Sequence, residues 1–365
     1  MARVMVAMSG GIDSTMAAAL LVEAGHDVTG VHLKMADTPS GLPGKGCCTL
    51  DDARDARRVA DRLGIPFYVW DFADTFTERV VEDFVAEYTA GRTPNPCVRC
   101  NERVKYAALM QRALTAGFDR LATGHHVRLS GGGDQQVRLL RPVDEGKDQT
   151  YVLYMASQEQ LRHSLFPVGI HRKADLRAMA AERGFVTATK PDSHDICFIP
   201  SGDTAGFLQA RIGRRPGPVV DGEGAVVGAH EGAYRFTVGQ RRGLGVSGLA
   251  EPRFVTGIAG NTVTIGRRED LEVEGLTASA VTWTTSAPDP DRTDLTAQVR
   301  YHGEALPCRV RLGPSGAMTV AFPETRPAGV APGQAVVVYA GEECLGGGTI
   351  ATTTALGPAE LPLPI

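Results

Sequence analysis

Roughly the first 200 residues alternate between short apolar runs and segments with helical periodicity, and few folds accommodate such an alternation. Buried strands are expected where the runs are apolar, at 3–8, 27–35, 65–72 and 118–126. Helices are expected between and after them, at 15–25, 50–64, 74–91 and 101–117. Strands that alternate with helices pair in parallel, and the helices then cover the sheet. We therefore predict an α/β fold, a parallel sheet with helices on both faces.

The sequence changes character near residue 205, where Gly, Pro and Arg become frequent and helical periodicity fades. From Leu276 onward, short strands separated by turn residues predict a small all-β barrel or sandwich. Residues 127–140 are expected to form an inserted hairpin that turns over 131–134, and the tail 356–365 is expected to be poorly ordered. The predicted parts are an α/β domain over 1–203, a small central domain over 204–275 and a C-terminal β-barrel domain over 276–365.

The composition limits where the protein works. Apolar residues make up 43% and charged residues 22% of the 365 residues, as in soluble globular proteins. No apolar run approaches the ~20 residues of a membrane span, and the first residues lack a signal-peptide pattern. We expect a cytoplasmic protein with no membrane partner, in which thiols stay reduced. The seven cysteines, an odd number, then favour metal binding or catalysis over a disulfide framework.

The net charge of −4 taken alone argues against a polyanionic partner. Net charge averages over the faces of a protein, however, and basic residues cluster along this chain, for example at 99–105 and 211–215. Nucleic-acid binding and a genome base composition that favours arginine codons explain these clusters equally well.

The turn "SGGIDS", residues 9–14, follows the first predicted strand and opens a helix. Backbone N–H groups at a helix N-terminus can hold phosphate, and ligands of parallel sheets bind beyond the carboxyl ends of the strands. The turn is neither a Walker A loop nor a dinucleotide fingerprint, because the spacing of its glycines fits neither. A tight strand-to-helix connection without a ligand is the alternative, but the position of the turn favours phosphate.

Cys97 and Cys100 form a C-x-x-C pair whose role the pair alone does not decide. A structural zinc site needs four ligands, and the adjacent residues Cys47 and Cys48 make a poor second pair. A thioredoxin-like switch places the motif after the first strand, whereas here it follows the third. Cys308 and Cys344 lie in predicted strands and are expected to be packing residues.

Two levels of resemblance narrow these choices. "SGGIDS" resembles the loop of the PP-loop ATP pyrophosphatases, which cleave ATP between the α and β phosphates. Six further stretches occur in the order found in bacterial tRNA-specific 2-thiouridylases, and the chain resembles that family over nearly its full length. The stretches are "TPNPCVRCNERVKY" (93–106), "ATGHHVR" (122–128), "KDQTYVLY" (147–154), "DSHDICFI" (192–199), "HEGAYRFTVGQRRGLG" (230–245) and "APGQAVVVY" (331–339).

The resemblance implies a reaction: ATP with Mg²⁺ adenylates the C2 carbonyl oxygen of the wobble uridine in tRNA, and sulfur from a cysteine persulfide replaces that oxygen. The products would be 2-thiouridine, AMP and pyrophosphate. The implied partners are the anticodon stem-loop of tRNA and a persulfide donor, either a sulfur-relay protein or a cysteine desulfurase. The chemistry is consistent, because a urea-like carbonyl releases its oxygen only after activation, and the activated base must be shielded from water.

The resemblance also implies roles for single residues. Cys100 matches the nucleophile, and Cys197 matches the cysteine that carries the persulfide and can pair with Cys100 in a disulfide. The segment facing the target base is Asn95, Pro96 and Cys97. The implied nucleotide-binding residues are Ala7, Met8, Ser9, Gly10, Gly11, Ile12, Asp13, Ser14, Met35 and Gly124. The implied tRNA contacts are His125, Lys147, Asp148, Gln149, Arg300, Tyr301 and Gln334.

Cys97 departs from the family pattern, because many members have Asp at this position. The substitution brings three cysteines, Cys97, Cys100 and Cys197, into one predicted site. Three thiolates are also the ligands of an iron–sulfur cluster with one open iron. The persulfide route is favoured, and the cluster stays open as an alternative. Two other functions stay open too, a small-molecule adenylating enzyme and a non-catalytic RNA- or metal-binding protein.

Overall fold

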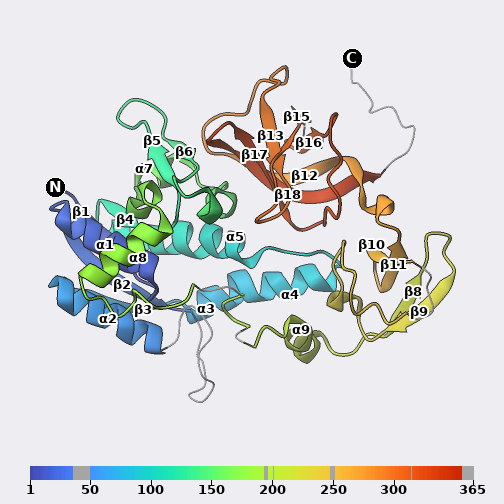
Figure 1. Cartoon of the computed structure of the whole chain (residues 1–365), viewed down its shortest axis with the longest axis horizontal. Coiled ribbons are helices and arrows are strands. Elements are labelled where there is room, and N and C mark those ends of the chain that lie inside the picture. The colour runs from blue at the N-terminus through green and yellow to red at the C-terminus, as the bar shows by residue number, and fades with distance from the viewer. Residues whose placement is uncertain (36–49, 193–195, 200, 247–250, 314, 356–365) are drawn as a thin grey trace.

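The structure, a computed structural model, describes residues 1–35, 50–192, 196–199, 201–246, 251–313 and 315–355. Figure 1 shows a parallel sheet with its helices near the N-terminus, a small second sheet at the opposite end of the molecule, and a β-barrel lying above the long helices between them. The predicted tail 356–365 and the pair Cys47–Cys48 lie outside the described residues.

The first part is built on a five-stranded parallel sheet in the order β3-β2-β1-β4-β7, as predicted. β1 lies in the middle, paired with β2 on one side and β4 on the other. The predicted strand 118–126 is shorter than expected, because the chain leaves the sheet after Ala122. The strands are β1 (Arg3–Ala7), β2 (Asp27–Lys34), β3 (Phe67–Asp71), β4 (Arg120–Ala122) and β7 (Ser164–Leu165).

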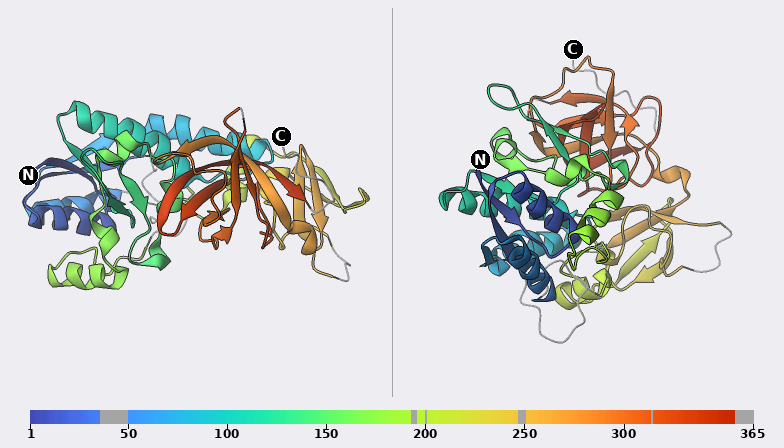
Figure 2. Two further views of the ribbon diagram at one scale, coloured as in Figure 1. Left: turned by 90° about the horizontal axis from the view of Figure 1, so that it is seen from above. Right: turned by 60° about the vertical axis from the view of Figure 1, so that its left-hand side comes forward.

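Helices cover both faces of this sheet, which confirms the predicted α/β fold (Figure 2). Side chains of β1 alternate between the faces, so that Val4 and Val6 pack under one layer while Met5 packs under the other. The first layer contains α1 (Ile12–Glu23), α2 (Leu50–Leu63) and α8 (Lys173–Glu182).

The second layer consists of two long helices, each interrupted by a π-helical stretch. The first runs through α3 (Ala73–Phe76), a π-helix at 77–81 and α4 (Glu82–Thr89). The second runs through α5 (Pro96–Cys100), a π-helix at 101–109 and α6 (Met110–Thr115). The predicted start of this helix at residue 101 is wrong, because Asn95 caps it and Pro96 occupies its first turn. The C-x-x-C pair therefore lies on a helix.

The central part, to which the sequence assigned no elements, folds around α9 (Thr204–Ile212) and a four-stranded sheet in the order β10-β11-β8-β9. A separate apolar cluster that includes Val219, Val255 and Val263 forms its core. The strands are β8 (Gly217–Val220), β9 (Val226–His230), β10 (Phe254–Ala259) and β11 (Thr262–Gly266).

The C-terminal part is the predicted all-β domain, whose strands form one sheet. The predicted hairpin is present as β5 (Arg128–Ser130) and β6 (Arg138–Leu140), but it adds to this sheet, because Leu139 pairs with Cys344 of β18. The remaining strands are β12 (Val273–Trp283), β13 (Leu295–Gln298), β14 (Leu306–Pro307), β15 (Arg309–Leu312), β16 (Met318–Ala321), β17 (Ala335–Ala340) and β18 (Glu343–Ala355).

The barrel and the first part share one apolar cluster, to which Leu109, Leu153, Val337 and Tyr339 all contribute. The short helix α7 (Gln158–Arg162) leads from this core back to β7. In the part of the chain that the structure describes, no helix combines the length and the apolar character needed to cross a membrane.

Candidate active site

The phosphate loop joins the carboxyl end of β1 to the N-terminus of α1. Its turn is closed by Ser14, whose Oγ accepts a hydrogen bond from the Ser9 N–H at 3.1 Å and donates one to the Gly11 carbonyl oxygen at 3.0 Å. Gly10 has a φ of +75°, and a Cβ there would lie 2.3 Å from the Asp52 carbonyl oxygen. The loop therefore needs glycine at this position, for its backbone conformation and for its packing against α2.

Asp13 is held by two groups from distant parts of the chain. His126 Nε2 lies 2.9 Å from Asp13 Oδ1, and Lys173 Nζ lies 2.7 Å and 2.6 Å from the two carboxylate oxygens. Burial favours the protonated acid, but the hydrogen bonds and charges of His126 and Lys173 outweigh it and lower the pKa of Asp13. The carboxylate is thus ionised beside the loop, where it can ligate a cation.

Gly124 borders the loop, and Met35 follows β2 at the same edge of the sheet; the nucleotide-binding role of both stays a prediction. A Cβ on Gly124 would lie 2.6 Å from the Asp13 carbonyl carbon and the Ser14 nitrogen, so only glycine allows this approach. Met35 is buried directly after β2, and its Sδ lies 4.0 Å from Cys100 Sγ. The contact therefore places the predicted nucleophile at the carboxyl end of β2.

The predicted base-facing segment opens α5. Asn95 Oδ1 accepts hydrogen bonds from the N–H groups of Cys97 at 3.0 Å and Val98 at 3.3 Å, so Asn95 is the N-cap. Cys97 is exposed, whereas Cys100, one turn later, is buried. The cap fixes both thiols on a rigid helix.

Cys197 lies in a turn whose neighbours are anchored in apolar clusters. The Phe198 ring meets those of Phe76, Phe84 and Phe207 at centroid separations of 5.7, 5.3 and 5.4 Å. Cys197 is half-buried and packs against the cluster that contains Cys100. The predicted disulfide between these two cysteines stays a prediction.

Three predicted residues from different parts of the chain meet beside the base-facing segment. Tyr301 of the barrel forms a hydrogen bond with Gln149 and interacts electrostatically with Cys97. Burial first, and then Cys97, raise the pKa of Tyr301. The Tyr301 ring also lies 5.8 Å from that of Tyr151. The C-terminal domain therefore brings Tyr301 within electrostatic range of Cys97.

Gln334 joins the barrel to the segment before α5. Its Nε2 donates to the Thr93 carbonyl oxygen at 2.8 Å, and the Thr93 N–H donates to the Pro332 carbonyl oxygen at 2.8 Å. Arg300 directly precedes Tyr301 in the sequence. Its side chain is exposed, so an RNA phosphate can reach it.

The remaining predicted tRNA contacts have partners within the chain. His125 is buried, accepts or donates a hydrogen bond with Thr123 Oγ1 at 2.7 Å, and has a pKa well below its usual value because burial opposes its charge. Asp148 binds Arg141 and accepts hydrogen bonds from Thr150. Lys147 Nζ donates to Asp192 at 2.9 Å. Their role in RNA binding stays a prediction.

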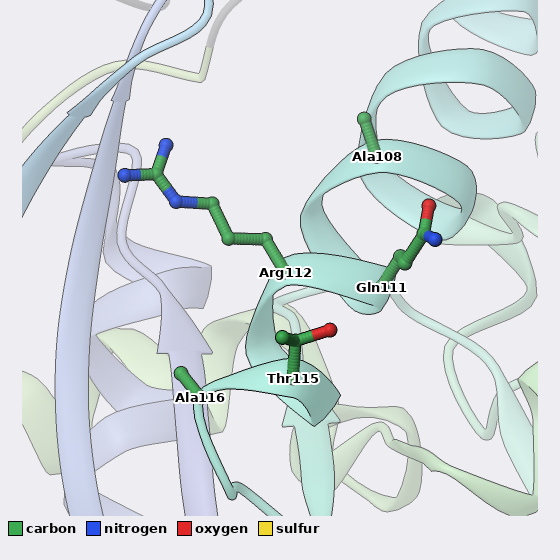
Figure 3. Close-up of a pocket in the computed structure, with 5 residues that line it drawn as sticks. All are labelled: Ala108, Gln111, Arg112, Thr115 and Ala116. Carbon is green, nitrogen blue, oxygen red and sulfur yellow. The ribbon is translucent and has the colours of Figure 1, made fainter.

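One hollow lies away from the predicted site residues. A depression of about 450 Å³ is bordered by side chains of the second long helix, and Figure 3 shows Arg112 reaching across it toward the neighbouring strands. It lies at the C-terminal end of α6, which leads into parallel strand β4, and so faces the sheet edge opposite to the phosphate loop. Its lining residues are Ala108, Gln111, Arg112, Thr115 and Ala116, none of them a predicted site residue.

Three family models match consecutive stretches of the chain. Residues 2–201 match a model described as tRNA methyl transferase HUP domain, 205–273 one described as tRNA methyl transferase PRC-barrel domain, and 273–350 one described as Aminomethyltransferase beta-barrel domain.

Curated relatives match nearly end to end. The tRNA-specific 2-thiouridylase MnmA of Thermobifida fusca (strain YX) is 53% identical over 357 residues, which cover 96% of this chain and 96% of that protein. The enzyme of the same name from Acidothermus cellulolyticus is 52% identical over 358 residues, 96% of this chain and 98% of that one. The chain belongs to the tRNA-specific 2-thiouridylase family. Its members are sulfur transferases. This membership excludes the two alternative functions, a non-catalytic binding protein and a small-molecule adenylating enzyme.

Among solved structures, a 4-thiouridine synthetase in complex with RNA and bound ATP is similar with a TM-score of 0.33 and 15% identity, over 57% of this chain and 50% of that chain. This likeness is too weak to add to the assignment to the thiouridylase family.

In this thiouridylase-family chain, the charged residues that surround Asp13 were not predicted from the sequence. His126, Lys173 and Asp192 lie far apart in the sequence and belong to no common motif, so no local pattern signals that they meet. Lys190 was missed for the same reason, although its Nζ donates to the Gly10 carbonyl oxygen at 3.0 Å and to Asp52 and Asp55 at 2.7 and 2.9 Å.

Proposed function

We propose that this chain is an ATP-dependent tRNA 2-thiouridylase that modifies the wobble uridine. The observation that carries the proposal is the turn 9–14, which joins the carboxyl end of β1 to α1 and holds the ionised carboxylate of Asp13. Met35 follows β2 at the same edge of the parallel sheet, and its Sδ lies 4.0 Å from Cys100 Sγ. A base adenylated at the loop would then lie at the sheet edge where the cysteine that completes sulfur transfer is found. The family membership supports the substrate, since the relatives are named for 2-thiouridine formation in tRNA.

The first step is activation of the base. The uridine O2 attacks the α-phosphorus of ATP, a bond forms between them, and pyrophosphate leaves. The loop residues 7–14 would hold the phosphates with backbone N–H groups at the N-terminus of α1. The ionised carboxylate of Asp13 fits a Mg²⁺ ion, a hard cation that prefers carboxylate oxygens and would neutralise the departing pyrophosphate.

The second step transfers sulfur. The terminal sulfur of a persulfide on Cys197 attacks C2, and AMP leaves with the former oxygen. The Cys100 thiolate then attacks Cys197 Sγ, which breaks the S–S bond, leaves sulfur on the base and joins the two cysteines in a disulfide. A thiol reductant must reduce this disulfide before the next turnover, and a cysteine desulfurase or a relay protein must supply the next persulfide.

The cysteines do not fit an iron–sulfur cluster. Within the described ranges, no three His, Cys, Asp or Glu side chains are arranged to hold a metal ion. Cys97 is exposed and Cys100 is buried one turn further along α5, so the two thiols face different surroundings. We therefore route no step through a cluster and assign Cys97 to the wall that faces the base, with Asn95 and Pro96.

The three-part division, 1–203, 204–275 and 276–365, forms part of the proposal. In it the first domain performs the chemistry and the C-terminal domain contacts tRNA through a surface that includes Arg300, Tyr301 and Gln334. Binding at this site requires the wobble base to leave the anticodon stack, as other enzymes that act on single bases require.

The test is single-turnover thiolation of an anticodon stem-loop with ATP and a persulfide donor. Cys100→Ala and Cys197→Ala should form no 2-thiouridine, while Cys97→Ala should keep activity. Cys308→Ala is the matched control, since Cys308 is a cysteine buried in the barrel core, away from the proposed chemistry.

Anaerobically purified protein should also be assayed for iron. Iron that is present in the wild type and lost on replacement of Cys97, Cys100 or Cys197 would show that the persulfide route is wrong. Thiolation that survives in Cys100→Ala would remove the proposed nucleophile.

A further inference from the structure

A chain of ion pairs connects the phosphate loop with the predicted tRNA-contacting turn. Lys173 Nζ binds both oxygens of Asp13 at 2.7 and 2.6 Å and lies 3.1 Å from Asp192 Oδ1. Asp192 Oδ2 in turn binds Lys147 Nζ at 2.9 Å. Asp13 belongs to the proposed nucleotide site and Lys147 to the proposed tRNA contacts. Lys173 and Asp192 form the bridge between them.

The burial of these groups changes along the chain of ion pairs. The Lys173 side chain is only 10% exposed, Asp13 and Asp192 are 32% and 22% exposed, and Lys147 at the outer end is 39% exposed. The middle of the chain is therefore weakly screened by water, while each end can be reached by a ligand of opposite charge. A cation would reach Asp13, and an RNA phosphate would reach Lys147.

Lys173 is held in place by its own backbone. It is the first residue of α8, its N–H donates to Asp144 Oδ2 at 2.9 Å, and α8 packs on α1, which carries Asp13. Its ammonium group is shared between two carboxylates that are both ionised, because the neighbouring cations lower the pKa of each despite burial. One cation between two anions can shift toward either of them without leaving the site.

We propose that Lys173 is a positioning residue that makes Mg·ATP binding and tRNA binding favour each other. The inference rests on the proposed function, in which Asp13 meets the nucleotide and Lys147 meets tRNA. In the structure Lys173 binds Asp13 more closely than Asp192, and Asp192 also binds Lys147 and Arg177. An RNA phosphate that takes Lys147 leaves Asp192 short of one cation, so Asp192 attracts Lys173 and frees Asp13 for the metal ion of the nucleotide. A metal ion at Asp13 drives the same exchange in reverse order.

Thermodynamic linkage makes this coupling measurable from both sides. The probes are α,β-methylene-ATP with Mg²⁺, which resists cleavage, and an unmodified anticodon stem-loop with uridine at the wobble position. In the wild type, each probe should tighten the binding of the other by the same factor, about 5- to 150-fold. Dissociation constants measured by calorimetry for each probe, with and without the other, provide that factor.

Three variants separate the bridge from general effects on the helix. Lys173→Met keeps the apolar stem and removes the charge, and Asp192→Asn breaks the bridge at its second member. In both, the coupling factor should fall to within about twofold of one. Arg183→Met is the matched control: Arg183 directly follows α8 and binds Glu23 of α1, at 2.7 and 3.0 Å, outside the chain of ion pairs. This control should keep the wild-type factor.

The outcomes distinguish the inference from the proposed function. A wild type that binds neither probe contradicts the proposed function itself. A wild type that binds both with a factor near one leaves the function standing and overturns the coupling. Coupling that persists in Lys173→Met, or that is lost equally in Arg183→Met, overturns the role of Lys173.

Discussion

Single residues in this protein are constrained most tightly where the phosphate loop meets its neighbours. Gly10 and Gly124 lie where a Cβ would overlap backbone atoms, and Asp13 is fixed from two sides by His126 and Lys173. A short motif can indicate a phosphate loop, but these contacts decide whether the loop has the shape that the chemistry needs.

Gly124→Ala tests that constraint. The added Cβ would lie 2.6 Å from backbone atoms of Asp13 and Ser14, so the loop must shift. We expect a loss of about 1–3 kcal/mol in the free energy of unfolding, as for other overpacked sites, and weaker ATP binding. Urea unfolding and nucleotide titration measure the two effects. Gly222→Ala, at an exposed position without positive φ where a Cβ meets no atom within 4 Å, is a control for added volume. Equal ATP affinity in wild type and Gly124→Ala would contradict the prediction.

Asp192 should make stability depend on acid. Burial opposes ionisation, but Lys147 and Lys173 lower the pKa of Asp192 from 3.8 to about 2. A carboxyl with a lowered folded-state pKa stabilises the fold above its unfolded pKa, and this contribution is lost as the pH falls from about 4 through about 2. Asp192→Asn should therefore show a smaller loss of unfolding free energy over that window than the wild type. Parallel acid dependence in urea unfolding of both proteins would rule this out.

At the scale of elements, the second long helix joins the chemistry to the rest of the molecule. Its first turn carries Cys97 and Cys100, Asn95 caps it, and the barrel is tied to the preceding Thr93 through Gln334. The placement of the cysteines therefore depends both on a local cap and on a contact made more than two hundred residues away in the sequence.

Asn95→Ala should weaken this arrangement through the cap alone. The loss of the bonds to the Cys97 and Val98 N–H groups should cost about 1 kcal/mol of stability and slow thiolation, because the first turn frays. Asn95→Asp keeps an acceptor at the cap and is the control for stability. Thermal unfolding followed by circular dichroism, together with the single-turnover assay, provides both readouts. The same stability for Asn95→Ala and Asn95→Asp would mean that the cap is not what holds the turn.

At the scale of the whole molecule, the first domain and the barrel are not independent. They share one apolar cluster, the β5–β6 hairpin of the first domain extends the sheet of the barrel, and the Arg141 guanidinium lies 3.9 Å from the Tyr339 ring centroid. The central sheet has a core of its own. Cooperative unfolding is therefore expected of the first domain and the barrel together.

Val337→Ala tests the shared core from the barrel side. Val337 is fully buried in the common cluster, and its truncation should cost about 2 kcal/mol. Calorimetry should show the transition that contains the first domain moving to lower temperature. Val310→Ala, at a buried position in the cluster confined to the barrel, is the matched comparison. A Val337→Ala effect on a separate barrel transition alone would show that the two domains unfold independently.

The sequence by itself determined most elements of the first domain and the β-rich character of the last, because strand and helix periodicity and glycine turns are local properties. It assigned no elements to the central part. The parallel sheet, its two helical layers, the hairpin at 127–140 and the β-rich C-terminal domain were all predictable in this way. The motifs of the thiouridylase family likewise predict the phosphate loop and the reactive cysteines. The start of the second long helix was missed, although Asn95 and Pro96 carry the local signals for it.

Only the tertiary structure decided what those elements bring together. Lys173, Asp192 and His126 gather around Asp13, the hairpin joins a sheet two hundred residues downstream, and Tyr301 of the barrel lies beside Gln149 and Cys97. These contacts depend on how apolar faces pack and on which buried charged groups form ion pairs. Both are energies of the assembled chain, to which residues far apart contribute at once, so no local stretch of sequence encodes them.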